Sequence, residues 1–145
     1  MREEEDVLMP TTIDSAIIEE RSRSAAHRGF DDIAFAREDE RILSARGENP
    51  FCGDEIEVRL VCSADVAGEQ VVERARFDGY ACTLCLAAAD ALMEQVEGMT
   101  ASQAASITFD DLCRWLDGLS VGRTRKGCVE LPLRALARAL ADGVH

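Results

Sequence analysis

Long hydrophobic runs and histidines are scarce in this 145-residue chain. No apolar stretch reaches the roughly 20 residues that a membrane-spanning helix requires, so we expect no membrane partner. The first six residues are mainly acidic, whereas a secretory signal begins basic and continues apolar. We therefore expect a cytoplasmic protein. The only two histidines are His27 and the terminal His145, which argues against a histidine-rich zinc enzyme.

Basic residues are also few: the chain has 16 lysines and arginines but 28 acidic residues, which gives a formal net charge of −12. Such a chain repels nucleic acid and anionic membranes, so we expect no nucleic-acid partner. A basic protein or a metal cation fits the sign of the charge better, although an acidic surface also serves solubility alone. The sequence has no glycine-rich phosphate loop, and no Ser-His-Asp catalytic set can be assembled from it.

The length and a hydrophobic share of 47% suit one domain with its own core. We expect a flexible acidic tail over residues 1–12 and a single domain over 13–145. A cytoplasmic domain of this size needs no disulfides, so some of the six cysteines are better explained as metal-binding or reactive.

The segment Asn49-Pro50-Phe51-Cys52-Gly53-Asp54 predicts a tight loop, because proline restricts its own φ and the residue before it, and glycine permits unusual backbone angles. A thiol and a carboxylate two residues apart on such a loop can face one centre. The alternating pattern that follows predicts a strand over 55–62.

The remaining patterns predict an α+β fold with a small antiparallel three-stranded sheet and helices packed on it. Two weakly patterned stretches are expected to be loops: 30–48, and a basic loop at 121–128. The other expected strands are 70–77 and a short one at 80–82. The expected helices cover 13–27, 83–97, a short stretch from Thr100 or Ser102, 108–118, and a last stretch starting near Leu131-Pro132.

Three cysteines are each expected beside a regular element: Cys52, Cys82 and Cys128. Because 29 and 45 residues separate them, no short metal-binding motif is present and the fold must bring them together. With Asp54 they would make a four-coordinate site for zinc or iron. The alternative is that they are inert buried cysteines, which are common.

Three segments then resemble the IscU/SufU/NifU N-terminal family of iron–sulfur cluster assembly scaffolds. They are residues 49–54, 77–92 and 125–136, in the order of the family's three cysteine regions, and the likeness spans roughly 13–142. The resemblance implies an α+β fold with the cysteines gathered at one end. It implies that Cys52, Asp54, Cys82 and Cys128 hold zinc, iron or a [2Fe–2S] cluster.

The resemblance also implies partners: a PLP-dependent cysteine desulfurase that donates sulfur, and apo iron–sulfur proteins that receive clusters. The candidate persulfide acceptors are Cys128 and Cys52, with Arg125 in a supporting role. Gly127 stands where IscU-type members carry histidine, while the spacing to Cys128 leaves little room for the SufU insertion. Two functions stay open: a cluster scaffold, and a zinc-dependent sulfurtransferase that never carries a cluster.

The other cysteines have simpler interpretations. Cys62 and Cys113 continue apolar stripes and are expected in the core. Cys85 follows Cys82 by three residues, which would suit a redox dithiol or a fourth sulfur ligand. We favour a small helix residue packed inward.

Overall fold

The computed structural model describes residues 16–50 and 53–142, without the side chains of Thr124 and Asp142. The tail expected over 1–12, the boundary expected at 13, and Cys52 lie outside these residues. The elements in chain order are α2 (Ala16–Arg23), η2 (Asp31–Ile33), β1 (Glu40–Asn49), β2 (Asp54–Ala64), β3 (Gln70–Tyr80), α3 (Thr83–Val96), α4 (Ala101–Ala105), α5 (Phe109–Trp115) and α6 (Arg123–Asp142).

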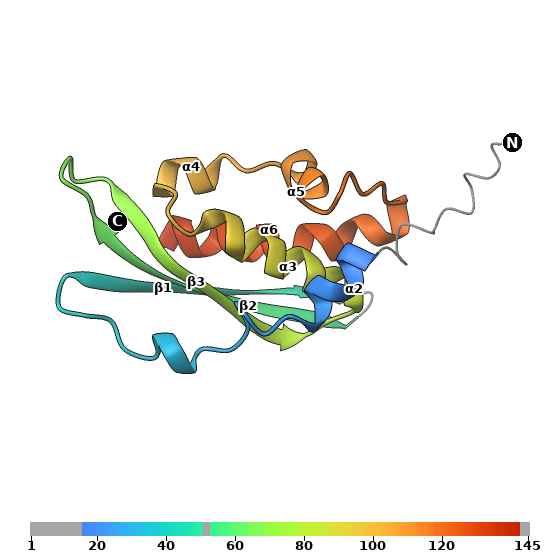
Figure 1. The fold of residues 1–145 in the computed structure, drawn as a ribbon, viewed down its shortest axis with the longest axis horizontal. Helices are drawn as coiled ribbons and strands as arrows, with labels where there is room; N and C mark the ends of the chain where they lie inside the picture. The colour runs from blue at the N-terminus through green and yellow to red at the C-terminus, as the bar shows by residue number, and fades with distance from the viewer. Residues whose placement is uncertain (1–15, 51–52, 143–145) are drawn as a thin grey trace, which may run out of the picture.

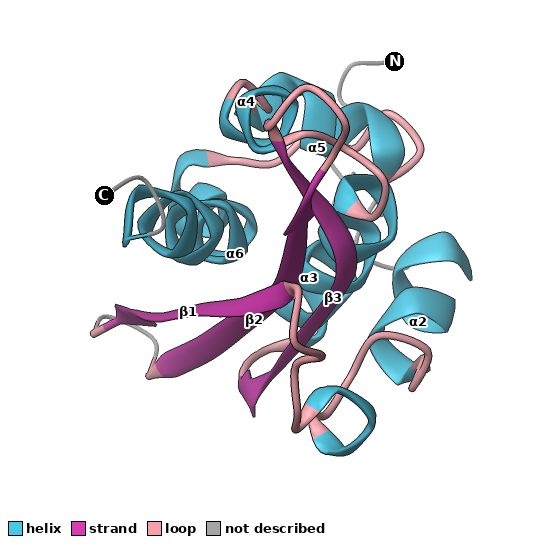
Figure 2. Ribbon diagram, turned by 90° about the vertical axis from the view of Figure 1, so that its left-hand side faces the viewer, coloured by secondary structure: helices cyan, strands magenta, loops and turns pink. Residues whose placement is uncertain are grey.

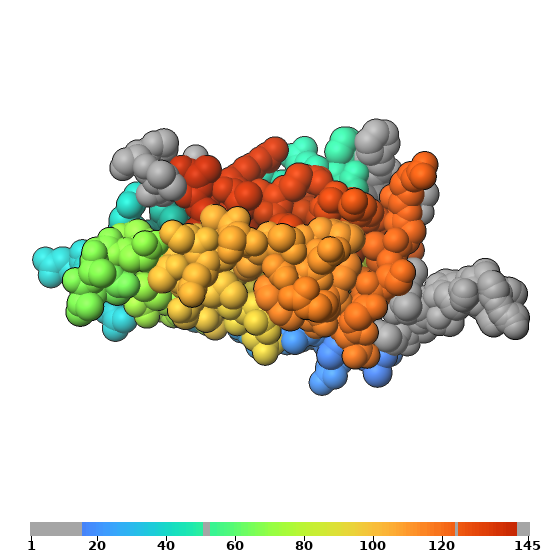
Figure 3. All heavy atoms as spheres, turned by 90° about the horizontal axis from the view of Figure 1, so that it is seen from above, coloured from blue at the N-terminus to red at the C-terminus, as the bar shows by residue number. Residues whose placement is uncertain are grey.

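The three strands form one antiparallel sheet in the order β1-β2-β3, which confirms the α+β prediction. Helices α3 and α6 cover one face of the sheet, and α4 and α5 lie beyond them (Figure 1). Helix α6 packs mainly on β1, and α2 packs beside α3 (Figure 2). Seen from above, α4, α5 and α6 form the outer surface of the helical layer (Figure 3).

Strand β2 is the centre of the core. Ile56, Val58, Leu60 and Cys62 alternate along it and are all buried beneath the helices, as the sequence pattern predicted. Alternate residues of a strand share a face, so this strand presents a continuous apolar surface to α3 and α6.

The prediction of a loop over 30–48 is wrong from Glu40 onward, because β1 occupies that stretch. Leu43, Ala45 and Gly47 pair with the inward-facing residues of β2. Two of these three are small, and α6 lies close to the second of them: a Cβ atom at Gly47 would be only 3.0 Å from Leu131 Cδ1. A strand whose buried face is made of small residues has little of the apolar alternation by which strands are recognised.

The short strand expected at 80–82 is also wrong, since Tyr80 is the last residue of β3. Asp78-Gly79 is part of this strand and not a turn. Gly79 is required there by a close approach of two backbones: its φ is +149°, and a Cβ atom would lie 2.0 Å from the Glu55 carbonyl oxygen. The third strand is therefore β1, which precedes the other two.

Strand β3 carries one extra residue at Glu73. Val61 of β2 pairs with Arg74, but the next residue, Cys62, pairs with Val72. Such a bulge reverses the alternation. As a result Val72 is buried, whereas Val71 is only partly buried.

The helix predicted over 83–97 is confirmed as α3, which is followed by Gly98 at a φ of +91°. Thr100 and Thr108 cap α4 and α5, each in a capping box. Helix α2 ends at Arg23, short of the predicted residue 27.

The basic loop expected at 121–128 is wrong, because α6 begins at Arg123. Pro132 was assigned to the first turn of the last helix, where proline is common, but it lies inside α6. Proline has no N–H for the carbonyl four residues earlier, which here belongs to Cys128. None of the helices within 16–50 and 53–142 is both long and apolar enough to cross a membrane.

Candidate metal site

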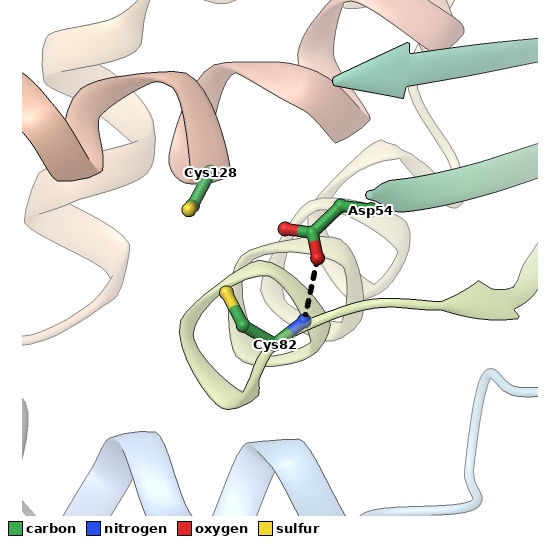
Figure 4. Close-up of side chains that lie close together, drawn as sticks. All are labelled: Asp54, Cys82 and Cys128. Atoms are coloured by element: carbon green, nitrogen blue, oxygen red, sulfur yellow. Dashed lines mark hydrogen bonds between the residues drawn. The ribbon is translucent and has the colours of Figure 1, made fainter. Parts of the chain in front are cut away.

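Three side chains from distant parts of the sequence meet at one end of the sheet. Asp54 is the first residue of β2, Cys82 immediately precedes α3, and Cys128 lies in the second turn of α6. One carboxylate oxygen and the two sulfur atoms all lie within 4.8 Å of one another. Figure 4 shows the three groups facing a common centre. The fold thus brings together three candidate ligands that are far apart in the sequence.

Asp54 is the most constrained of the three. Its side chain is only 5% exposed, and its Oδ1 accepts a hydrogen bond from the Cys82 backbone N–H at 3.1 Å. Its Oδ2 is buried and has no hydrogen-bond partner among the residues that the structure describes. A buried carboxylate oxygen left in that condition is costly unless a cation satisfies it. The donor set therefore fits a metal ion.

Cys82 is the N-cap residue of α3, as its predicted position before that helix required. Its Sγ accepts a hydrogen bond from the Cys85 backbone N–H at 3.4 Å. The free N–H groups and the dipole of a helix N-terminus favour negative charge there. The thiolate is the form of cysteine that binds metals and attacks sulfur.

Cys128 is 5% exposed and belongs to a helix, whereas the sequence analysis expected it in a loop. Arg125 lies three residues earlier in the first turn of α6, and its side chain is half-buried. Gly127 faces the end of β1: a Cβ atom there would lie 3.1 Å from Asn49 Nδ2. A larger residue at position 127 would press on that amide.

Of the four ligands expected from the sequence, the structure brings together Asp54, Cys82 and Cys128. The fourth, Cys52, lies outside the described residues, and its role stays a prediction.

The remaining cysteines behave as core residues. Cys62 and Cys85 are fully buried, and Cys113 packs against the core. Desolvation raises the pKa of the Cys62 thiol to about 11. Burial also raises the pKa of Cys113, and the neighbouring Asp110 carboxylate adds to that rise.

Sequence reasoning did not predict two contacts made by residues next to Cys128. The Asn49 side chain reaches position 127, and Lys126 Nζ lies 5.1 Å from the centre of the Phe109 ring. Asn49 was noticed only as a turn residue. Both contacts depend on α6 starting at Arg123, so no local signal in the sequence would have found them.

Comparison with known proteins identifies the family of this chain. The family model of the NifU-like N-terminal domain matches residues 34–143, and the chain belongs to that family of iron–sulfur cluster assembly scaffolds. The chain is 34% identical over 94 residues to the bifunctional protein NifU/MnmA of Rubrobacter xylanophilus, covering 65% of the chain and 18% of that protein. It is 32% identical over 68 residues to the nitrogen fixation protein NifU of Nostoc sp., covering 47% of the chain and 22% of that protein. The chain thus spans only about a fifth of the length of these curated relatives.

Solved structures share the fold. One is a protein of Fervidobacterium islandicum described as an iron–sulfur cluster assembly scaffold for the SUF system, with a TM-score of 0.62, 22% identity, and coverage of 90% of this chain and 98% of that one. Another is the N-terminal part of a NifU-like protein of Brucella abortus, with a TM-score of 0.68, 17% identity, and coverage of 94% and 99%.

Proposed function

We propose that this chain is a scaffold on which iron or a [2Fe–2S] cluster is assembled and from which it passes to apo iron–sulfur proteins. Cys52, Asp54, Cys82 and Cys128 would be the ligands, and a PLP-dependent cysteine desulfurase would donate the sulfur. Membership of the NifU-like N-terminal domain family supports this choice among metal-binding functions.

The observation that carries the proposal is the Asp54–Cys82–Cys128 cluster, with the unpartnered Oδ2 of Asp54 beside two sulfur atoms. Thiolates are typical ligands of iron–sulfur clusters and of zinc. A carboxylate in place of one thiolate makes the donor set harder, which suits a site that releases its cargo more than one that holds it permanently.

Sulfur transfer requires a thiolate that reaches the donor. The acceptor Sγ attacks the terminal sulfur of the donor's persulfide, a new S–S bond forms, the old one breaks, and the desulfurase thiolate leaves. The proton of the transferred sulfur stays on it. Cys128 is only 5% exposed, so acceptance there requires its sulfur to become more accessible to the donor. Cys52 is the other candidate acceptor.

The second candidate function is a zinc-dependent sulfurtransferase that accepts persulfide from the desulfurase and carries no cluster. The specific observation in its favour is Gly127, which faces Asn49 and supplies no imidazole beside Cys128. The same ligands would then hold zinc, and metal binding would keep the thiols deprotonated.

The deciding experiment is metal and acid-labile sulfide analysis of protein purified without oxygen, before and after incubation with a cysteine desulfurase, cysteine and ferrous iron. We expect stoichiometric iron and sulfide with a thiolate-to-iron absorption band. Tightly held zinc, no labile sulfide and a faster desulfurase would support the sulfurtransferase instead.

The matched variants are Cys82→Ser and Cys62→Ala. Cys82 belongs to the cluster, whereas Cys62 is a core residue on β2 with a pKa raised by burial. We expect the first variant to lose iron and sulfide and the second to keep them. Equal metal content and equal desulfurase stimulation in both variants would overturn the site.

A further inference from the structure

The Cys82-Thr83-Leu84-Cys85 segment holds a second thiol that the proposed ligand set does not use. Cys85 lies in the first turn of α3 and is fully buried, as expected for an inward-packed helix residue. Its backbone N–H nevertheless donates to Cys82 Sγ at 3.4 Å. One of the metal ligands is therefore held against the residue that carries the second thiol.

The geometry of a helix start suits a disulfide between these residues. Cα atoms three residues apart in a helix are about 5 Å from one another. The usual Cα separation across a disulfide is roughly 4.4–6.8 Å, so the backbone need not move far. Cys82 has extended backbone angles, with φ −67° and ψ 164°, and its side chain already turns back over the first turn.

The two thiols differ in access. Cys82 is partly exposed, while Cys85 is closed off from solvent, so an external oxidant meets Cys82 first. A pair with one accessible and one buried thiol reacts in a fixed order, because the accessible thiol meets the external disulfide first and the buried thiol, in the adjoining helical turn, then displaces the small thiol from it.

We propose that Cys82 and Cys85 are a reversible dithiol–disulfide pair whose oxidation removes Cys82 from the Asp54–Cys82–Cys128 site. The oxidant is a low-molecular-weight disulfide. The Cys82 thiolate attacks one sulfur of it, forming a mixed disulfide and releasing one thiolate. The Cys85 sulfur then attacks Cys82 Sγ, the second small thiol leaves, and the Cys85 proton passes to solvent or to that thiol. Two protein thiols are oxidised and one small disulfide is reduced to two thiols.

Cys128 is the competing partner, because its Sγ lies within 4.8 Å of Cys82 Sγ. A Cys82–Cys128 bond would have to join two separate elements, α3 and α6, whose spacing is fixed by their packing. The Cys82–Cys85 bond closes within one turn of a single helix. We therefore assign Cys85 as the resolving residue.

The consequence for the site rests on the proposed function. A disulfide sulfur is no longer a thiolate ligand, so oxidation would leave Asp54 and Cys128 as the described donors and release the metal. Reduction by a thiol would restore the site. The pair thus makes metal loading depend on the redox state of its surroundings.

The test treats the full-length chain with glutathione disulfide, quenches it in acid, alkylates the remaining thiols and maps the bonds by mass spectrometry. Trypsin places Cys82, Cys85 and Cys113 in peptide 77–114 and Cys128 in peptide 127–134, and a second cleavage after Glu94 isolates the first two. We expect the fragment holding Cys82 and Cys85 to lose two hydrogens and escape alkylation. A link between peptides 77–114 and 127–134, or a stable glutathione adduct on Cys82, would overturn the proposal.

Two variants provide matched controls. In Cys85→Ser, glutathione should remain on Cys82, because the resolving thiol is absent. In Cys113→Ser, which removes the third cysteine of the same tryptic peptide, the Cys82–Cys85 bond should form as in the wild type. Zinc release followed in the same samples tests the link to the site: a disulfide that forms in a chain that never binds metal would refute the proposed function and leave the dithiol pair standing.

Discussion

Replacing Asp54 with asparagine separates the effect of this carboxylate on the stability of the metal-free protein from its contribution to metal binding. Asparagine has nearly the same shape, and its Oδ1 can still accept the hydrogen bond that Asp54 takes from the Cys82 N–H at 3.1 Å. The substitution removes the charge and the buried, unpartnered Oδ2. We expect the variant to be more stable than the wild type without metal and less stabilised than the wild type with metal.

The magnitudes follow from burial. An unsatisfied buried polar oxygen costs about 1–3 kcal/mol, and the asparagine NH₂ recovers only part of that beside weakly accepting sulfur atoms. We expect a gain of about 1 kcal/mol in the metal-free state, which raises Tm by about 2–4 °C in a domain of this size. Loss of a residue that only hydrogen-bonds to a metal ligand weakens metal binding about 10–100-fold. Loss of the ligand itself should therefore weaken metal binding by about 100-fold or more.

The assay is thermal unfolding with a chelator and with zinc at about 100 times the wild-type Kd. Mass action then stabilises the wild type by about 2.7 kcal/mol, but a variant with a 100-fold weaker site by only about 0.4 kcal/mol. Glu55→Gln is the control, because Glu55 is the next residue, is partly exposed and pairs with Arg46 at 2.8 Å. If Asp54→Asn lowers Tm in chelator and keeps the full zinc response, the reasoning about the orphaned oxygen is wrong.

Three further outcomes test the fold around the site. Gly79→Ala should lower the unfolding free energy by about 3 kcal/mol or more in urea melts, since its Cβ would meet the Glu55 carbonyl. The control is Gly68→Ala, which should cost about 1 kcal/mol because Gly68 has a φ of +88° but open space around it. Equal losses in the two variants would refute the close approach at Gly79. Cys62 should react with iodoacetamide at pH 8 more than about 100-fold slower in the folded chain than in the unfolded one, because its pKa is raised to about 11. The pKa of Asp111 is lowered by its hydrogen bond with the Thr108 backbone and then by Arg114. The ionised Asp111 therefore stabilises the fold above the pKa of the unfolded chain, near 4, and this stabilisation is lost as the pH falls further. Asp111→Asn should flatten the acid limb of a curve of Tm against pH.

The parts of the fold that could be predicted are those whose cause is local. The alternation from Ile56 to Cys62 and the alanine-rich run after Cys82 each carry their period in a few residues, and both elements are confirmed. The parts that failed have a tertiary cause. Gly47 fits the close packing of Leu131 against β1, which the local sequence does not reveal, and Pro132 lies inside a helix that packs along β1, β2 and α3, although proline usually ends or kinks a helix.

The candidate site divides in the same way. Asp54 and Cys82 lie at the starts of locally predictable elements, so their positions followed from the sequence once those elements were placed. Cys128 did not, because its setting depends on where α6 begins. Its place beside a regular element made it a candidate ligand, the resemblance to a family strengthened that prediction, and the structure brings its sulfur to the other two groups.

The position of Cys128 is set by a contact outside the metal site. Leu131 follows Cys128 by three residues, so the two side chains lie one turn apart on neighbouring parts of the α6 surface. Leu131 is fully buried, and its side chain packs over Gly47 of β1, where even a Cβ atom would come within 3.0 Å. A methyl group at position 47 would need the end of the Leu131 side chain to shift by a few tenths of an ångström, whereas a large side chain would also meet the Leu131 carbonyl and Ala135, and we expect it to push this part of α6, with Cys128, away from Asp54 and Cys82. Gly47 thus contributes to the site indirectly: it lets α6 pack closely on the sheet, and this packing holds Cys128 near Asp54 and Cys82.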